Sequence, residues 1–253
     1  MKVTFLGTGT SQGVPLIGCT CEVCSSESTF DKRLRSSIQI DINDKVFVID
    51  SGPDFRQQML RAKTKKLDAL IFTHEHKDHI AGMDDIRAFN YLNKKVIDVY
   101  ASLPVQAALK REYQYVFAEK KYPGIPQINL ITIDSTPFFI DAIEVIPIEV
   151  FHFKMPVLGF RIQDFTYITD ANFISEKEKE KIKGSKVLVL NALRKEKHIS
   201  HFTLDEAISL AQELEIPTVY FTHISHQLGL HKEVPKILPS NMFLAFDELV
   251  IEI

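Results

Sequence analysis

The stretch THEHKDH (residues 73–79) places three histidines and one aspartate side by side, directly after the apolar run DALIF (68–72). The four candidate ligands are His74, His76, Asp78 and His79. Packing explains such a cluster poorly, because each buried imidazole or carboxylate would need its own polar partner. In a loop that leaves the end of a strand, these side chains can converge on one side. The stretch therefore predicts a metal site.

Three more candidate ligands stand at the ends of apolar runs elsewhere in the chain. His152 follows IEVIPIEVF (143–151), Asp170 closes FTYITD (165–170) and His223 closes TVYFTH (218–223). The carboxyl ends of strands are where layered α/β proteins build their sites. We therefore expect these side chains to join the 73–79 cluster, which gives enough ligands for two ions.

The remaining patterns indicate alternating strands and helices. Short β-branched runs predict strands over 2–6, 37–42, 45–50, 68–73, 96–101, 142–151, 165–170, 186–192, 218–223 and 249–253. Helical patterns cover 54–62, 83–92, 103–113 and 203–214, and the charge run 175–184 is typical of a solvated helix. Thr203 and Glu206 are spaced as a capping box. The fold class is α/β or α+β, with layered sheets and outer helices.

The stretch GCTCEVC (18–24) holds all three cysteines of the chain, Cys19, Cys21 and Cys24. An odd, clustered set favours a metal over disulfides. Structural zinc sites are tetrahedral, and His226 in THISHQ (222–227) is the candidate fourth ligand. The predicted zinc knuckle would tie the N-terminal loop to the loop after His223. Alternatively, His226 is a surface residue, and the thiols bind metal with water or with another chain.

The length, the net charge and the apolar runs of the chain limit the classes of protein to which it can belong. The 253 residues make one large domain or two small ones, and the net charge of −3 argues against a protein that coats nucleic acid. No apolar run approaches the ~18 residues of a membrane helix, and the N-terminal segment reaches glycines too early for a signal peptide. We expect one domain over 1–253, in the cytoplasm, without membrane or nucleic-acid partners. A homodimer is compatible with the sequence.

The signature His-x-His-x-Asp-His, taken with His152, Asp170 and His223, resembles the metallo-β-lactamase-fold hydrolases over nearly the whole chain. The resemblance implies a four-layer αββα sandwich with a two-metal site at its edge. It assigns one ion to His74, His76 and His152, the other to Asp78, His79 and His223, and a bridging role to Asp170. Asp50, in VIDSG, matches the aspartate that orients a ligand histidine in this family.

Two features indicate which branch of this family the sequence resembles. β-Lactamases of this fold usually carry a cysteine where this chain has Asp170, which favours the phosphodiesterase, nuclease and glyoxalase-like branches. The knuckle and the run FTHISHQ resemble the phosphoribosyl cyclic phosphodiesterases of the carbon–phosphorus lyase pathway. That likeness, carried by SHFTLDEAI (200–208), implies that His201 is the general acid. His198 is a competing acid. His231, in GLHKEVP, either lines the mouth of the substrate site or faces solvent.

The function implied is hydrolysis of a small phosphodiester, linear or cyclic, by hydroxide generated at two divalent ions. Mixed imidazole and carboxylate ligands suit Zn²⁺ or Mn²⁺, and the knuckle would hold one structural Zn²⁺. Asp78 and His201 are the expected catalytic residues. A ribonuclease that processes tRNA 3′ ends is an alternative, since the stretch 109–126 mixes basic and aromatic residues as RNA contacts do. A thioester or lactone hydrolase of the same fold and an inactive metal-binding module are further alternatives.

Overall fold

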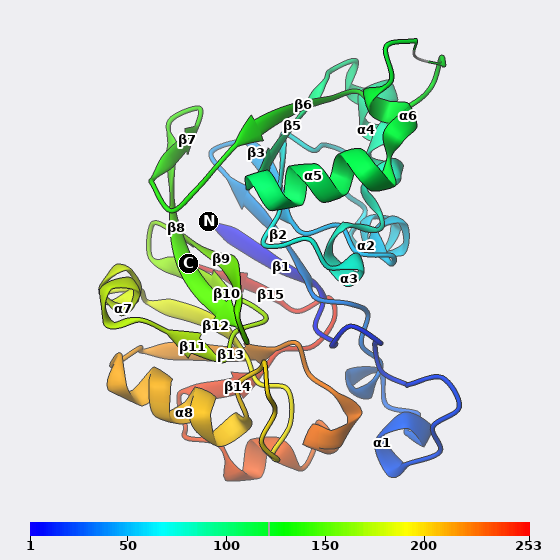
Figure 1. The fold of residues 1–253 in the computed structure, drawn as a ribbon. Helices are drawn as coiled ribbons and strands as arrows, with labels where there is room; N and C mark the ends of the chain where they lie inside the picture. Colours follow the sequence, from blue (N-terminus) through cyan, green and yellow to red (C-terminus); the bar gives the residue numbers. More distant parts are fainter. Residues whose placement is uncertain (121) are drawn as a thin grey trace.

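The computed structural model describes residues 1–120 and 122–253 and consists of two β-sheets packed face to face, with helices on both outer faces (Figure 1). Three buried apolar clusters separate the layers. One lies between the two sheets, and each of the others lies between one sheet and its helices. The predicted four-layer αββα sandwich is confirmed.

The first sheet brings two site segments to one edge. Its seven strands run in the order β15 (Val250–Glu252), β1 (Lys2–Gly7), β2 (Ser37–Ile42), β3 (Lys45–Ile49), β4 (Ala69–Ile71), β5 (Ile97–Ala101) and β6 (Ile128–Thr132). The strands β3, β4, β5 and β6 are parallel neighbours, so their carboxyl ends share an edge. Asp50 directly follows β3, and the stretch 73–79 begins two residues after β4.

The second sheet supplies the other candidate ligands. Its main path is β11 (Phe173–Ile174), β8 (Ile143–His152), β9 (Met155–Ile162), β10 (Phe165–Ile168), β12 (Val187–Asn191), β13 (Thr218–Thr222) and β14 (Met242–Leu244), and β7 (Phe138–Ile140) pairs with β8. Strand β9 is antiparallel to both β8 and β10, and β10, β12 and β13 are parallel. The carboxyl ends of β8, β10 and β13, where His152, Asp170 and His223 stand, therefore lie at the same edge.

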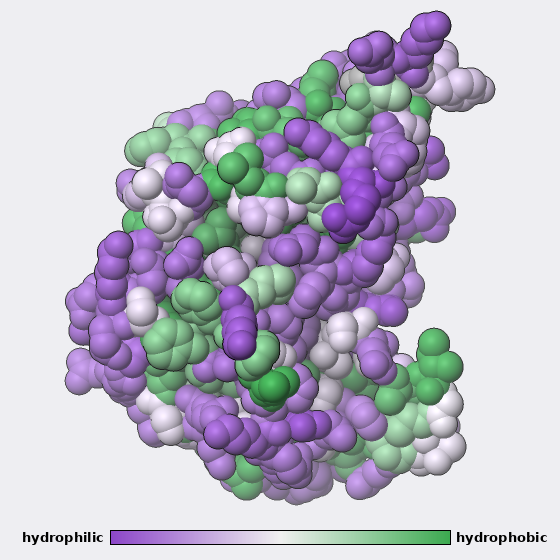
Figure 2. All heavy atoms as spheres, viewed as in Figure 1, coloured by the Kyte–Doolittle hydropathy of each residue, from purple (hydrophilic) through white to green (hydrophobic). Residues whose placement is uncertain are grey.

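The helices cover the outer faces and the edge. The α-helices are α1 (Glu22–Ser25), α2 (Phe55–Ala62), α3 (Lys77–Ile80), α4 (Arg87–Asn93), α5 (Leu103–Glu112), α6 (Gln114–Phe117), α7 (Glu176–Ile182) and α8 (Leu204–Glu213). The 3₁₀ turns are η1 (Thr29–Asp31), η2 (Met83–Ile86), η3 (His226–Leu228) and η4 (Val234–Ile237). The lobe that carries α1 projects from the body and shows hydrophobic surface (Figures 1 and 2). No helix among the described residues has both the length and the apolar character needed to cross a bilayer.

Several sequence-based expectations differ from the structure. The predicted helix 83–92 is the 3₁₀ turn η2 followed by α4, and Met83, Ile86 and Phe89 are the residues buried along it. Five strands were not predicted, namely β6, β7, β9, β11 and β14, and β9 contains Pro156 and Gly159. A Cβ at Gly159 would lie 2.9 Å from the Tyr167 carbonyl oxygen, so this glycine allows the close approach of β10.

Candidate metal centre

The strand ends bring four candidate ligands into one cluster. Ligand atoms of Asp78, His79, Asp170 and His223 all lie within 4.8 Å of one another. Asp78 and His79 lie in α3, which follows β4, whereas Asp170 and His223 follow β10 and β13 of the other sheet. The cluster therefore lies at the edge of the sandwich, between the two sheets.

Asp50 fixes the orientation of His79. The Asp50 carboxylate is fully buried and accepts hydrogen bonds from the Thr73 amide at 2.9 Å and the Thr73 hydroxyl at 2.8 Å. Its Oδ2 lies 2.7 Å from His79 Nδ1, which donates to it. With the proton on Nδ1, the lone pair of His79 Nε2 points toward the cluster. The predicted contact between Asp50 and a ligand histidine is confirmed for His79.

The surroundings of His79 Nε2 fit a metal ion. This nitrogen is buried and makes no hydrogen bond, although Asp78 Oδ2 lies 3.1 Å away and Asp170 Oδ2 lies 3.2 Å away. Burial disfavours the imidazolium, but the carboxylates of Asp170, Asp78 and Asp50 outweigh it and raise the pKa of His79 well above its usual range. Without an ion, the imidazolium supplies the positive charge that these carboxylates favour. A divalent ion bound in that place would supply the charge instead and would leave the Nε2 lone pair of His79 as a ligand.

Asp170 touches both halves of the site. Its Oδ2 lies beside His79 and 3.2 Å from His223 Nδ1, and its Oδ1 lies 3.1 Å from His201 Nε2. Asp50, Asp170 and His223 all have positive φ angles, of 65°, 55° and 55°. Left-handed backbone is uncommon for residues other than glycine and gathers at functional sites. The position of Asp170 is the one expected of a bridging ligand.

The remaining candidate ligands, His74, His76 and His152, lie next to one another, and His74 also lies beside His79, with ring centroids 4.1 Å apart. His74 Nε2 is 3.1 Å from His76 Nδ1, and the rings of His76 and His152 are 5.2 Å apart. His152 donates from Nδ1 to the Ser200 carbonyl oxygen at 2.9 Å, which leaves its Nε2 free to bind a metal. Burial lowers the pKa of His74 well below its usual range and keeps the imidazole neutral, the form that coordinates metals.

His201 lies directly beside two of the candidate ligands. His152, Asp170 and His201 present ligand atoms within 4.8 Å of one another. The Nδ1 atoms of His201 and His198 are 3.1 Å apart, so His198 stands behind His201. Of the two histidines that the sequence offered as an acid, His201 is the one whose ring contacts Asp170.

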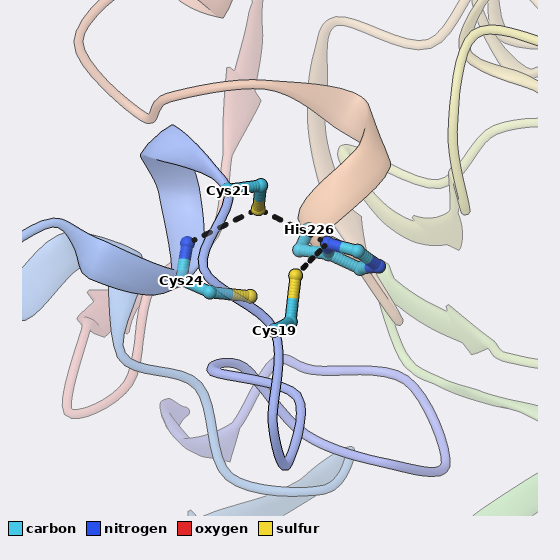
Figure 3. Close-up of side chains that lie close together, drawn as sticks. All are labelled: Cys19, Cys21, Cys24 and His226. Atoms are coloured by element: carbon cyan, nitrogen blue, oxygen red, sulfur yellow. Dashed lines mark hydrogen bonds between the residues drawn. The ribbon is translucent and has the colours of Figure 1, made fainter.

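The three cysteines and His226 form a second cluster (Figure 3). Cys19 Sγ and Cys21 Sγ lie 3.5 and 3.2 Å from His226 Nδ1, and the four ligand atoms lie within 4.8 Å of one another. The amides of Leu16 and Cys24 point at the sulfurs of Cys24 and Cys21, at 3.3 and 3.4 Å. Amide donors stabilise thiolates, so this donor set fits a closed structural zinc site.

The sequence did not single out three neighbours of the ligands. The Thr73 hydroxyl lies 3.0 Å from His74 Nδ1, Thr10 Oγ1 lies 3.3 Å from His223 Nε2, and Ser200 receives the His152 hydrogen bond. Thr73 could have been found from its place beside the ligands. Thr10 and Ser200 are contacts of the tertiary structure, with no signal in the local sequence.

The structure gives His231 a structural position. Its Nδ1 lies 3.1 Å from a guanidinium nitrogen of the buried Arg33, and its ring stacks on Phe30 at a centroid distance of 5.0 Å. Its amide donates to Asp31 at 2.8 Å. These contacts join the segment after α1 to the segment after η3.

Comparison with known proteins agrees with this geometry. Residues 45–224 match the beta-lactamase superfamily domain, and the chain belongs to this superfamily, with the metallo-β-lactamase fold. A solved structure, described as a new diphosphatase from the PhnP family, superimposes with a TM-score of 0.93. It is 37% identical and covers 100% of this chain and 97% of its own.

Two curated relatives are longer proteins. An octanoyltransferase from Porphyromonas gingivalis is 38% identical over 253 residues, which are 98% of this chain and 51% of that protein. A ribonuclease Z from Acaryochloris marina is 27% identical over 169 residues, which are 65% of this chain and 48% of that protein. The chain thus spans about half the length of the curated relatives that it matches.

Proposed function

We propose that the chain is a dinuclear metal-dependent phosphodiesterase that acts on small phosphodiesters, linear or cyclic. The observation that carries the proposal is Asp170, whose two carboxylate oxygens contact His79 and His223 on one side and His201 on the other. The similar protein described as a diphosphatase supports chemistry at phosphorus.

The ligand sets proposed are those of the family. Asp78, His79 and His223 would hold one ion, His74, His76 and His152 the other, and Asp170 would bridge them. Two divalent ions there, Zn²⁺ or Mn²⁺, would supply a water of lowered pKa and would neutralise charge on the phosphoryl oxygens. A structural Zn²⁺ would be held by Cys19, Cys21, Cys24 and His226.

His201 is proposed as the general acid, and Asp78 as a ligand without which catalysis fails. His201 borders a cavity of about 280 Å³ that is also lined by Thr10, Gln12, Arg194 and Gln227. A leaving group in this cavity could take the proton of His201. His198 lies 3.1 Å from His201 Nδ1 and would orient the ring. His201 Nε2 lies 3.1 Å from Asp170 and would turn its proton to the leaving group once Asp170 binds the ions.

The test of the proposal is hydrolysis of bis-p-nitrophenyl phosphate by the purified protein, loaded with Mn²⁺ or Zn²⁺. We expect metal-dependent turnover that is lost in Asp78→Ala, while the variant keeps its fold by circular dichroism. No turnover with either ion, in folded and metal-loaded protein, would contradict the proposal and favour thioester or lactone substrates.

The acid role of His201 has its own test. His201→Ala should slow the hydrolysis of alkyl phosphodiesters by about 10²–10⁴-fold, because their alkoxide leaving groups need a proton. The hydrolysis rate of nitrophenyl esters should fall much less, since nitrophenolate is a good leaving group without a proton. Equal losses on both substrates would remove His201 from this role.

A ribonuclease that processes tRNA is the second candidate, favoured by the similarity to ribonuclease Z. The net charge of −3 counts against it, because RNA binding draws on positive charge. Absence of tRNA binding at low salt would dismiss it. The acyl transfer named for the Porphyromonas gingivalis relative is not proposed here, because this chain spans about half of that protein.

A further inference from the structure

A second cavity borders the metal-binding stretch on the flank away from His201. It has a volume of about 360 Å³, and we name it the Glu75 cavity. Its walls include Thr73 and Glu75 of the stretch 73–79, Leu103 and Ile133 after β5 and β6, and Glu149 and Met155 of β8 and β9. Nothing in the proposed phosphoryl chemistry uses this cavity.

The Glu75 cavity and the metal centre share walls. Thr73, which lines the cavity, contacts His74 Nδ1 at 3.0 Å. Met155, which also lines it, pairs across the β8–β9 ladder with His152. Side chains of directly opposed residues lie on the same face of a sheet, so Met155 stands beside this ligand.

The topology places the metal centre between two cavities. In the first sheet, β5 and β6 lie on one side of β4, and β1 lies on the other. The Glu75 cavity lies at the ends of β5 and β6. The cavity that contains His201 is lined by Thr10 and Gln12, which follow β1. A phosphodiester has two organic substituents, and each can therefore occupy its own cavity when the phosphorus lies at the centre.

The lining of the Glu75 cavity selects the chemistry of its occupant. Leu103, Ile133 and Met155 give it apolar walls. Three carboxylates line it (Glu75, Asp134 and Glu149), and no Lys, Arg or His among the described residues does. The Glu75 and Glu149 carboxylates have no hydrogen-bond or ion-pair partner within the described part of the chain.

These properties exclude an anionic occupant and favour a flat apolar group that donates hydrogen bonds. A second phosphate would meet three negative charges, whereas a nucleobase offers ring faces to the apolar walls and amino groups to the carboxylates. The volume is within the range of about 300–1,000 Å³ seen for small-ligand sites. Adenine, guanine and cytosine carry exocyclic amino groups, and uracil does not.

We infer that the Glu75 cavity is a nucleobase subsite and that the substrates are nucleoside phosphodiesters, with the leaving group on the His201 side. The inference rests on the proposed phosphodiesterase function and adds the substrate class to it. Adenine-type bases are preferred to uracil, because their amino groups reach the carboxylates.

The test compares esters that share one leaving group. Adenosine 5′-(p-nitrophenyl) phosphate, its uridine counterpart and methyl p-nitrophenyl phosphate release the same nitrophenolate at the same centre. We expect kcat/KM to be at least about tenfold higher for the adenosine ester than for the methyl ester, with uridine between them. Turnover of the methyl ester with no gain for adenosine would overturn the subsite and leave the proposed function intact. No turnover of any of the three would remove both.

Two variants locate the base. Leu103→Trp fills the cavity mouth, and it should lower the ratio of kcat/KM for the adenosine ester to kcat/KM for the methyl ester to about one. Leu60→Trp is the matched control, since Leu103 and Leu60 are 67% and 61% exposed and Leu60 does not line the cavity. Glu149→Gln should narrow the gap between adenosine and uridine. An adenosine preference that survives Leu103→Trp would place the base elsewhere and overturn the assignment.

Discussion

At the scale of single residues, the site depends on which atom of each side chain faces inward. Asp50 binds no ion in the proposed arrangement, yet it decides which nitrogen His79 presents. Its second oxygen is occupied by the Thr73 amide, so the carboxylate cannot rotate without losing a buried hydrogen bond. Residues that orient ligands can therefore matter to metal affinity as ligands do.

Asp50→Asn should weaken metal binding at the Asp78–His79–His223 position by about 10–100-fold, because an amide can donate to His79 Nδ1 and favour the wrong tautomer. Competition with a chromophoric chelator measures the affinity. Asp98→Asn, on β5 and bonded to Asn129, is the matched control and should leave affinity unchanged. Equal affinities for Asp50→Asn and the unmodified protein would contradict the orienting role.

The knuckle thiols should differ in reactivity in metal-free protein. The hydrogen bond with His226 lowers the pKa of Cys21 to about 6, whereas burial raises the pKa of Cys24 to about 11. The thiolate is the reactive form, so iodoacetamide at pH 7 should label Cys21 before Cys24. Mass spectrometry across pH should show the Cys21 rate levelling above pH 7 and the Cys24 rate still rising at pH 9. Parallel profiles would contradict this difference.

At the scale of elements, the strands end where the ligands begin. Each strand that carries a ligand ends at the sandwich edge, and helix α8 begins three residues after His201. The predicted capping box at the start of α8 is confirmed, with Thr203 Oγ1 accepting from the Glu206 amide and Glu206 accepting from the Thr203 amide. The capping box therefore fixes the direction in which the chain leaves the loop that carries His201.

Thr203→Ala should lower the free energy of unfolding by about 1 kcal/mol, because the Glu206 amide loses the Thr203 hydroxyl as its acceptor. Urea unfolding followed by circular dichroism measures the change. Ser209→Ala on the same helix removes a hydroxyl that bonds only the Asp205 carbonyl within the described chain, so it should cost less. A loss of the same size in both variants would show that the cap has no special effect.

At the scale of the whole molecule, segments far apart in sequence meet at the site. The loop after β1 bridges to the loop after β13, with the Thr10 amide donating to the Ile224 carbonyl oxygen and the Ile224 amide to that of Thr8. The knuckle joins the same two loops through His226. The structural ion would therefore hold Thr10 against His223.

Metal content gives the prediction at this scale. We expect about three ions per chain, and Cys24→Ser should lower the content by about one, with a lower melting temperature, since a structural zinc contributes to folding free energy. Atomic emission spectrometry and calorimetry measure both quantities. His226→Asn should reproduce the loss if the two residues share one ion. A full metal content in both variants would contradict the shared site.

The sequence by itself determined the chemistry and the layers. The 73–79 cluster, the polar residues at strand ends and the cysteine cluster are local patterns, because a ligand set and a strand both depend on near neighbours. Most strand and helix positions could be predicted for the same reason. Strand β9 could not, because its proline and glycine are tolerated only through pairing with its neighbours.

Only the tertiary structure decided the distances. It placed His201 beside Asp170, set His198 behind His201, brought Thr10 to His223 and gave His231 a partner in Arg33. It also formed the Glu75 cavity from five separate segments of the chain, which lie in or after β4, β5, β6, β8 and β9. These contacts join residues up to 213 positions apart. No local pattern encodes such contacts, since they arise only when two sheets pack and their edges align.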